Sequence, residues 1–135
     1  NALIEADAWS APSRAEQLLA GLGFRPDQWM LPVREFSGGW QMRLSLARAL
    51  MAPSDLLLLD EPTRGIDVGT KAEIQKLVLS LAEEGKACVF ISSELEEVLR
   101  TSHRIVVLRE REKVAEFDGE VDENTIIHAF AGSEA

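Results

Sequence analysis

The sequence predicts an α/β fold in which a parallel sheet is covered by helices. Residues 56–59 are four leucines in a row, between Pro-Ser-Asp at 53–55 and the acidic pair at 60–61. An apolar run of this length is typical of a strand buried on both faces, as in a parallel sheet. A second apolar run at 87–92 follows a segment of helical periodicity at 70–83, which indicates a βαβ unit with a right-handed crossover.

The first helix is predicted to begin at a capping box, Ser13-Arg14-Ala15-Glu16. Apolar residues then recur on one face, and the glycines of Gly21-Leu22-Gly23 suit its end. The segment from Pro26 to Pro32 reads as a short turn or helix. It leads to the Ser-Gly-Gly sequence at residues 37–39.

Ser37 is expected to be the N-cap of a second helix, which runs from Trp40 to about Ala52 before Pro53. Gly38 and Gly39 would let a ligand approach the backbone closely. The free N–H groups and positive dipole end of this helix suit a phosphate. Ser-Gly-Gly alone is more often an ordinary cap, but its place ahead of the leucine strand favours the phosphate interpretation.

Asp60 and Glu61 close the leucine strand. Two adjacent acids at the end of a buried strand are costly unless they hold a metal, a water or a proton. In a Walker B strand the first acid serves Mg²⁺ and the second orients water against a phosphate. The alternative is an acid pair that caps the next turn.

The C-terminal part of the chain continues the alternation of helices and strands. A second capping box, Thr70-Lys71-Ala72-Glu73, is predicted to start the helix between the two buried strands. The remaining predicted elements are a short helix at 94–100, a hairpin of strands at 104–108 and 113–117, and a helix from the Asp122 cap through Phe130, closed by Gly132. The hairpin turn contains no glycine.

The composition fits a globular domain of 135 residues, with 46% apolar and 27% charged residues. No apolar run approaches the ~20 residues that a membrane-spanning helix needs. The net charge of −9 argues against direct binding of nucleic acid. The single cysteine, Cys88, lies in an apolar run and is expected to be a core residue in a reducing cytosol.

Three of these motifs together resemble the ATP-binding cassette (ABC) ATPases. Ser-Gly-Gly-Trp-Gln at 37–41 resembles their signature motif, residues 56–61 resemble their Walker B strand, and Arg-Gly-Ile-Asp at 64–67 occupies the place of their D-loop. The resemblance implies the second half of one nucleotide-binding domain, with a P-loop NTPase-type sheet that lacks the Walker A strand. Residues 1–52 would form part of the helical subdomain and the signature helix, and residues 53–135 would belong to the catalytic core.

The resemblance also implies roles for individual residues. Asp60 would hold the Mg²⁺ shell through water, and Glu61 would polarise the attacking water. Asp67 would couple the two nucleotide sites of a cassette pair. The γ-phosphate of ATP held by the partner cassette would be bound by the signature residues, which are Ser37, Gly38, Gly39 and Gln41.

Two departures from the family pattern bear on activity. The chain contains no Gly-x-x-x-x-Gly-Lys-[Ser/Thr] sequence, so it is expected to hydrolyse no ATP alone. Ser93 stands where many ABC ATPases carry a switch histidine, and a serine donates one hydrogen bond but carries no positive charge. Ser93 is nevertheless a catalytic candidate beside Glu61 and Asp67. His103 is interpreted as structural or exposed.

The two halves of the chain resemble different branches of the superfamily. Residues 1–60 are similar to ABC-F proteins, which act on the ribosome, whereas residues 61–135 look like the second cassette of simple-sugar importer ATPases. One hypothesis is a mosaic joined across the shared Asp-Glu-Pro-Thr block at 60–63.

Three functions follow from the resemblance. The first is an ATPase segment coupled to sugar import, partnered by a second cassette and a membrane permease. The second is an ABC-F type translation factor partnered by the ribosome. The third is a non-catalytic remnant. The expected location is the cytoplasm, or the inner face of the membrane. In the helical subdomain, Trp9 and Trp29 would either contact a membrane partner or another cassette, or be buried by packing.

Overall fold

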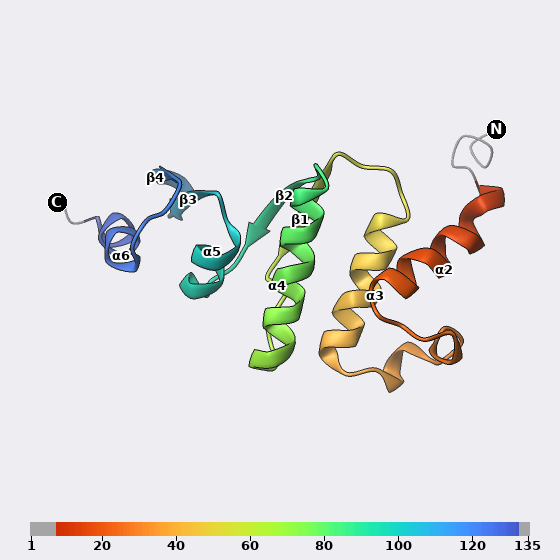
Figure 1. Cartoon of the computed structure of the whole chain (residues 1–135). Coiled ribbons are helices and arrows are strands. Elements are labelled where there is room, and N and C mark those ends of the chain that lie inside the picture. The colour runs from red at the N-terminus through yellow and green to blue at the C-terminus, as the bar shows by residue number, and fades with distance from the viewer. Residues whose placement is uncertain (1–7, 133–135) are drawn as a thin grey trace. The chain divides into compact units, whose positions relative to one another are not determined.

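A computed structural model of the chain describes residues 8–132. These residues form two compact units. Figure 1 labels the helices and strands that belong to them. The first unit contains residues up to 57 together with 63–88, and the second contains 58–62 and 89 onward. The subdomain boundaries expected from the sequence include residues 1–7 and 133–135, which lie outside the described range, and they stay a prediction.

The first unit is mainly helical. Its elements are the short 3-10 helices η1 (Ala8–Ser10), η2 (Pro26–Gln28) and η3 (Val33–Glu35) and the α-helices α2 (Ala11–Gly21), α3 (Gly38–Leu50) and α4 (Val68–Glu83). Helix α3 contacts both α2 and α4. The short helix η2 agrees with the turn or helix predicted between Pro26 and Pro32, whereas η3 follows that segment and was not predicted.

Helix α2 begins earlier than predicted. Its first residue is Ala11, its N-cap position is Ser10, and Pro12 lies in its first turn. Ser13 is therefore inside the helix, and the capping box predicted there is wrong. The reason is that proline in the first turn needs no hydrogen-bond partner for its nitrogen and fixes a helical φ angle. The predicted end is confirmed, because α2 ends at Gly21.

Helix α4 also begins earlier than predicted, at Val68. Its N-cap is Asp67, whose carboxylate accepts hydrogen bonds from the Thr70 N–H at 3.0 Å and from the Thr70 hydroxyl at 2.7 Å. Thr70 is thus the partner of the cap rather than the cap itself, and the capping box predicted at Thr70 is wrong.

An aromatic and cationic cluster joins the end of α2 to α3. The Phe24 ring packs edge-on against Trp40 and Phe36, with centroid distances of 4.8 and 5.5 Å. The Arg43 guanidinium lies 4.6 Å from the centroid of the Trp40 ring and donates a hydrogen bond of 2.9 Å to the Leu22 carbonyl. These contacts fix the chain on both sides of the loop that carries the Ser-Gly-Gly sequence.

Strands β1 (Leu56–Asp60) and β2 (Ala87–Ile91) pair in a two-stranded sheet. The Ala87 N–H binds the Asp55 carbonyl at 2.9 Å, and the Glu61 N–H binds the Ile91 carbonyl at 2.8 Å. The starts of the two strands therefore lie together and so do their ends, which makes the pair parallel. Together with α4, this confirms the predicted order of strand, helix and strand.

The prediction that the leucine strand is buried on both faces is wrong for the described residues. Leu57 and Leu59 are buried, whereas Leu56 and Leu58 are 55% and 61% exposed. On β2 the exposed side chains also alternate with half-buried ones, so Cys88 is half-buried rather than fully inside the core. The physical reason is that one face of this two-stranded sheet is left uncovered.

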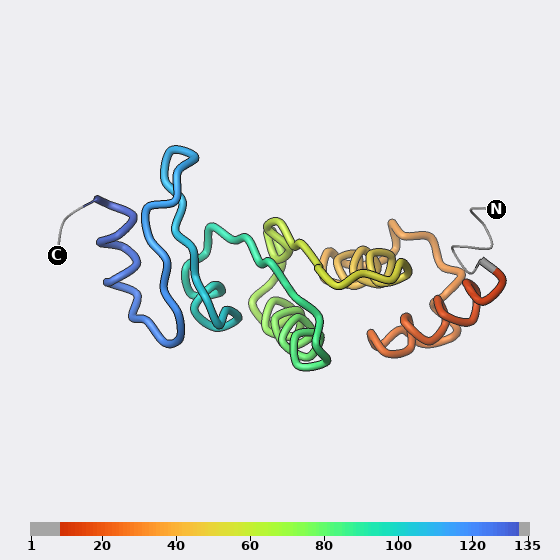
Figure 2. The backbone as a smooth tube through the Cα atoms, turned by 90° about the horizontal axis from the view of Figure 1, so that it is seen from above, coloured from red at the N-terminus to blue at the C-terminus, as the bar shows by residue number. Residues whose placement is uncertain are grey.

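The second unit is built around the antiparallel hairpin of β3 (Arg104–Arg109) and β4 (Glu112–Asp118), as predicted. Helices α5 (Leu95–Thr101) and α6 (Glu123–Ala131) accompany the hairpin, and α6 runs beside it in Figure 2. The buried core of this unit consists of Ile105, Val107 and Ile126. The predicted Asp122 cap is confirmed, because its carboxylate accepts the Thr125 N–H at 3.0 Å.

Among residues 8–132, no helix is long and apolar enough to cross a membrane. The two tryptophans near the start of the chain differ in exposure. Trp9 is 87% exposed, which leaves it available for contacts, whereas Trp29 is half-buried. His103 is exposed, which agrees with the interpretation given to it from the sequence.

Candidate functional site

The Ser-Gly-Gly sequence lies at the start of α3, as predicted. Ser37 occupies the N-cap position, but its side chain makes no capping hydrogen bond. The loop is instead closed by Gln41, whose side-chain amide donates to the Phe36 carbonyl at 2.8 Å and whose N–H donates to the Ser37 carbonyl at 2.9 Å. The first N–H groups of an α-helix have no acceptor within the helix. This end of α3 therefore keeps the donors that an anion requires.

The two glycines of this loop differ in their surroundings. Gly39 is buried, and a Cβ atom built on it would overlap the methyl group of Thr70. Gly38 is exposed, and the atom nearest to the place that a Cβ would take there belongs to the Ile66 side chain, 4.0 Å away. Glycine is thus required at position 39 by helix packing, whereas position 38 leaves room next to the backbone.

The starts of α3 and α4 lie side by side. Gly39 contacts Thr70, and one turn further along each helix Arg43 forms an ion pair with Glu73. The first turn of α3 therefore lies against the first turn of α4, and the second turn against the second. The two helices run in the same direction, and their N-termini meet at one end. Two positive dipole ends are thereby brought together.

Asp67 offsets part of this positive potential. Its hydrogen bonds from Thr70, the side chain first and the main chain second, hold the pKa of the Asp67 carboxyl below its usual value of 3.8. The carboxylate therefore stays charged at neutral pH. The structure gives Asp67 a capping role, which the D-loop resemblance did not imply.

Asp60 and Glu61 lie where the sequence predicts, at the carboxyl end of β1. Asp60 is exposed, and Glu61 is half-buried with a left-handed backbone conformation, φ = 47°. One Glu61 carboxylate oxygen accepts the Ser93 N–H at 2.9 Å. The structure therefore brings together Glu61 and Ser93, which are 32 positions apart in the sequence.

Two residues beside this pair were not predicted as functional. The Ser92 hydroxyl donates to a Glu97 carboxylate oxygen at 3.0 Å and accepts the Glu94 N–H at 3.0 Å. Glu97 is only 4% exposed. The sequence shows Glu97 only as one of several glutamates in the short helix after β2. Without the structure, such a glutamate is interpreted as an ordinary surface charge.

The candidate residues thus form two groups. Ser37, Gly38, Gly39, Gln41 and Asp67 lie at the shared helix end of the first unit, and Asp60, Glu61 and Ser93 lie at the strand end of the second.

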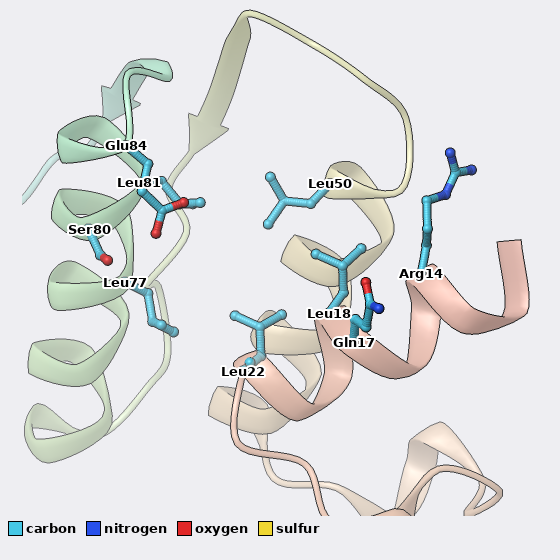
Figure 3. A pocket seen from close by; sticks show the side chains of 10 residues that line it. Arg14, Gln17, Leu18, Leu22, Leu50, Leu77, Ser80, Leu81 and Glu84 are labelled. Atoms are coloured by element: carbon cyan, nitrogen blue, oxygen red, sulfur yellow. The ribbon is translucent and has the colours of Figure 1, made fainter. Parts of the chain in front are cut away.

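The apolar pocket of about 410 Å³ drawn in Figure 3 contains none of these residues. It lies within the first unit, between α2, α3 and α4, and is lined by side chains that include Leu18, Leu50 and Leu77.

The donor set near Asp60 limits how a metal could bind. Within residues 8–132, no three His, Cys, Asp or Glu side chains are grouped closely enough to hold an ion on their own. Mg²⁺ in nucleotide sites is commonly held by one or two carboxylates together with phosphates and water. A single exposed aspartate fits that kind of site and does not fit a site made of protein ligands alone.

Comparison with known proteins agrees with this arrangement. The ABC transporter family model matches residues 3–64. The fructose import ATP-binding protein FruK of Bifidobacterium longum is 46% identical over 125 residues, which cover 91% of this chain and 24% of that protein. The ribose import ATP-binding protein RbsA of Rhodococcus jostii is 50% identical over 105 residues, 77% of this chain and 21% of that protein. The chain is part of an ABC transporter ATPase domain.

Solved structures share the fold of this cassette segment. A nucleotide-free ATP-binding cassette from an ABC transporter superposes with a TM-score of 0.79 at 24% identity, over 92% of this chain and 47% of that chain. A dimeric cassette bound to ADP and phosphate superposes with a TM-score of 0.67 at 28% identity, over 78% of this chain and 46% of that chain. The segment therefore spans about half of a solved cassette and about a quarter of the sugar-import relatives.

The likeness to sugar importers is not confined to the second half of the chain. Residues 61–135 are 75 of the 135, so a match that covers 91% of the chain also extends through most of the first sixty. A single relative thus accounts for both halves, and the separate ABC-F resemblance of residues 1–60 is not shown. The mosaic hypothesis is unnecessary to explain this sequence.

Proposed function

We propose that this segment supplies the signature motif, the Walker B acids and the D-loop of a cassette that binds and hydrolyses ATP to drive sugar import. The observation that carries the proposal is the acidic pair at the end of β1, with the Glu61 carboxylate held by the Ser93 N–H at 2.9 Å. The coupling to import is supported by relatives named as fructose and ribose import ATP-binding proteins. Because those names differ in the sugar, the proposal is made for simple sugars as a class.

The acidic pair would divide the chemistry between its two members. Asp60 would hold Mg²⁺ through water, and the ion would supply positive charge beside the phosphates of ATP. Glu61 would accept a hydrogen bond from the attacking water and direct that water at the γ-phosphate. In this proposal Ser93 contributes its main-chain N–H, which fixes the direction of the Glu61 carboxylate.

The loop at the start of α3 would bind the γ-phosphate of ATP held by a second cassette. Ser37 and Gly38 are exposed there, and the N–H groups of the first turn provide donors. Gln41 would act indirectly, because its side-chain amide closes the loop onto the Phe36 carbonyl. Asp67 would couple the two sites while it caps α4.

The partners in this proposal are a second cassette and a membrane permease, and the segment would work at the cytoplasmic face of the membrane. The solved dimeric cassette bound to ADP and phosphate supports pairing as the working arrangement. The relatives reported above are named as import ATP-binding proteins, so the proposal does not include a role on the ribosome.

A chimera tests this function directly. The aligned part of the Bifidobacterium longum fructose importer ATPase is replaced by this chain, and ATP hydrolysis and fructose uptake are measured. We expect both activities to be retained, and we expect Glu61→Gln to abolish them. Glu84→Gln, which changes an exposed glutamate after α4, serves as the matched control. Retained uptake in the Glu61→Gln chimera would contradict the role given to Glu61.

The isolated chain is expected to show no measurable ATP hydrolysis. Its sequence contains no Gly-x-x-x-x-Gly-Lys-[Ser/Thr] loop, and therefore none of the backbone donors and lysine that bind the β- and γ-phosphates. Phosphate release from ATP and Mg²⁺ is measured with the purified 135 residues. Turnover that Glu61→Gln removes would overturn this prediction, whereas turnover insensitive to that change would indicate a contaminant.

A further inference from the structure

A chain of hydrogen bonds, continued through the main chain from Ser92 to Ser93, connects the core of the second unit to the Glu61 carboxylate. We infer that Ser92 and Glu97 are positioning residues for Glu61, because they fix the turn after β2 whose N–H binds that carboxylate. The catalytic meaning of this chain rests on the proposed function of Glu61. The hydrogen-bonded chain itself is a property of the fold and can be tested without nucleotide.

The first link is the strained backbone of Glu61. A residue with a side chain rarely adopts a left-handed conformation such as φ = 47°, and it keeps that conformation only where its surroundings enforce it. Two hydrogen bonds do so here. The Glu61 N–H donates to the Ile91 carbonyl at 2.8 Å, and the carboxylate accepts the Ser93 N–H at 2.9 Å. Both partners belong to the end of β2 and the turn that follows it.

The second link is Ser92, whose hydroxyl organises the same turn. A hydroxyl has one proton to donate and lone pairs to accept with. The Ser92 proton goes to Glu97 and a lone pair receives the Glu94 N–H, each at 3.0 Å. Ser93 lies between Ser92 and Glu94, which these hydrogen bonds hold in place. The direction of the Ser93 N–H is therefore set by the turn.

The third link is Glu97, a carboxylate that is almost completely buried on α5. Burial of a charged group is costly, and it persists where the group is hydrogen-bonded in place. The Thr101 hydroxyl donates to the Glu97 carbonyl at 2.7 Å. Leu95, Val98 and Leu99 of the same helix pack against the hydrophobic core of the unit. Glu97 is thereby carried by a helix that packs against the buried core of the second unit.

This arrangement explains how a serine can stand at position 93. The group that binds Glu61 is the main-chain N–H of Ser93, which every residue except proline provides. The side chain at position 93 is therefore not what holds Glu61. The residues whose side chains matter for this contact are Ser92 and Glu97.

The test is the amide exchange rate of Ser93, measured by NMR on the complete 135-residue chain without nucleotide. Ser92→Ala is expected to raise this rate about tenfold, the size expected for loss of one hydrogen bond to a charged group. Ser92→Thr keeps the hydroxyl and should restore the slow rate. Glu97→Ala, which removes the acceptor of the Ser92 hydroxyl proton, should also raise the rate, whereas Glu96→Ala, at an exposed neighbour on α5, should leave it unchanged.

A double-mutant cycle separates positioning from a general loss of structure. In a Glu61→Ala background the acceptor is gone, so Ser92→Ala should cause no further increase in the Ser93 rate. The inference is overturned if Ser92→Ala leaves the Ser93 rate unchanged, or raises it equally when Glu61 is absent. If Ser92→Ala raises the exchange rate of every amide of the unit, Glu97→Ala is compared with Glu96→Ala by the same criterion. Because no nucleotide is present, failure of the import proposal would not alter this result.

Discussion

Gly39 illustrates how one residue type can satisfy two different demands. From the sequence, both glycines of the Ser-Gly-Gly loop are assigned to close approach of a ligand. In the structure, Gly39 is buried and the side chain of Thr70 fills the space that its own side chain would need. Gly38 remains exposed and free of such contacts. The packing of α3 against α4 is therefore sufficient to explain Gly39.

Substitution of Gly39 by alanine is expected to lower the free energy of unfolding by about 1–3 kcal/mol, the usual range for overpacking a close contact. Gly38→Ala is the matched control and should change stability by less than about 0.5 kcal/mol, because nothing blocks its Cβ. Urea unfolding monitored by tryptophan fluorescence measures both.

A second substitution tests the assigned cause. Thr70→Ser removes the methyl group that the alanine introduced by Gly39→Ala would strike, and it keeps the hydroxyl that binds Asp67. We therefore expect Thr70→Ser to recover most of the stability lost in Gly39→Ala. Equal stability of the two glycine variants would show that the contact with Thr70 relaxes without cost.

The two helix-capping aspartates predict a dependence of stability on acid. Hydrogen bonds from Thr70 and Thr125 lower the pKa values of Asp67 and Asp122 below the usual 3.8. A lowered folded-state pKa means that the stabilisation is fully present above pH 3.8 and is lost as the pH falls through the lower value. The free energy of unfolding should therefore decrease as the pH falls below about 4.

Asparagine at either cap keeps an acceptor oxygen but does not titrate. Asp67→Asn and Asp122→Asn should each make the fall in stability between about pH 4 and pH 2 shallower, and the double variant should make it shallower still. Thermal unfolding across that range supplies the measurement. A slope that is the same in all four proteins would mean that other groups control the acid transition.

At the scale of elements, the β3–β4 turn departs from the residues usually found in such turns. Glu110 and Arg111 both have positive φ angles, 51° and 70°, between the paired residues Arg109 and Glu112. Two-residue hairpin loops with positive φ at both positions favour asparagine and glycine, because other side chains are strained there. The hairpin forms in spite of its turn residues, because its strands pack into the core of the second unit.

Arg111→Gly is expected to raise the free energy of unfolding by about 0.5–1 kcal/mol, because glycine adopts a positive φ without strain. Glu112→Gly is the matched control one residue later, where the backbone is an ordinary strand, and it should lower stability by a similar amount. Chemical denaturation measures the change in the free energy of unfolding for both variants. An increase for Arg111→Gly and a decrease for Glu112→Gly would support the assignment of the strain to the turn. A loss of stability in both would contradict it.

Most elements could be predicted from the sequence, but two helix starts could not. The Asp-x-x-Thr pattern gives the start of α6 at Asp122, and the same pattern at Asp67 marks the true start of α4. Thr70 also resembles a cap, and the sequence alone does not rank two candidate caps three residues apart. At α2 the proline at position 12 is the feature that moves the start forward.

The candidate site was predictable only in part, for a related reason. Asp60 and Glu61 could be placed at a strand end because a strand and its neighbouring acids are contiguous in the sequence. The contact between Glu61 and Ser93 spans 32 positions and depends on the pairing of β1 with β2, which periodicity does not report. The burial of Glu97 was not predictable, because a glutamate in a short helix is exposed in most proteins.

At the scale of the whole molecule, the uncovered face of the β1–β2 sheet has the largest consequence. Leu56 and Leu58 are more than half exposed, and Val89 and Ile91 are 42% and 43% exposed. Alternation along each strand and the parallel pairing place all four side chains on one face. A contiguous apolar surface of this kind promotes association when nothing covers it.

The isolated chain is therefore expected to self-associate. Leu58→Lys places a charge on the exposed face and should shift the population toward monomer in sedimentation velocity experiments. Leu57→Lys, on the opposite and buried face of the same strand, should instead unfold the protein. A monodisperse wild-type monomer with sharp thermal unfolding would show that this face does not drive association.

Thr70 belongs to two contacts at once, and this sharing has a mechanical consequence. Its methyl group fills the place of the missing Gly39 side chain, while its hydroxyl and N–H hold Asp67. We expect a displacement of Asp67 to act on Gly39 directly through Thr70, one turn before the Arg43–Glu73 ion pair joins the same two helices. We therefore expect the residues that precede α3 and those that precede α4 to move together rather than independently.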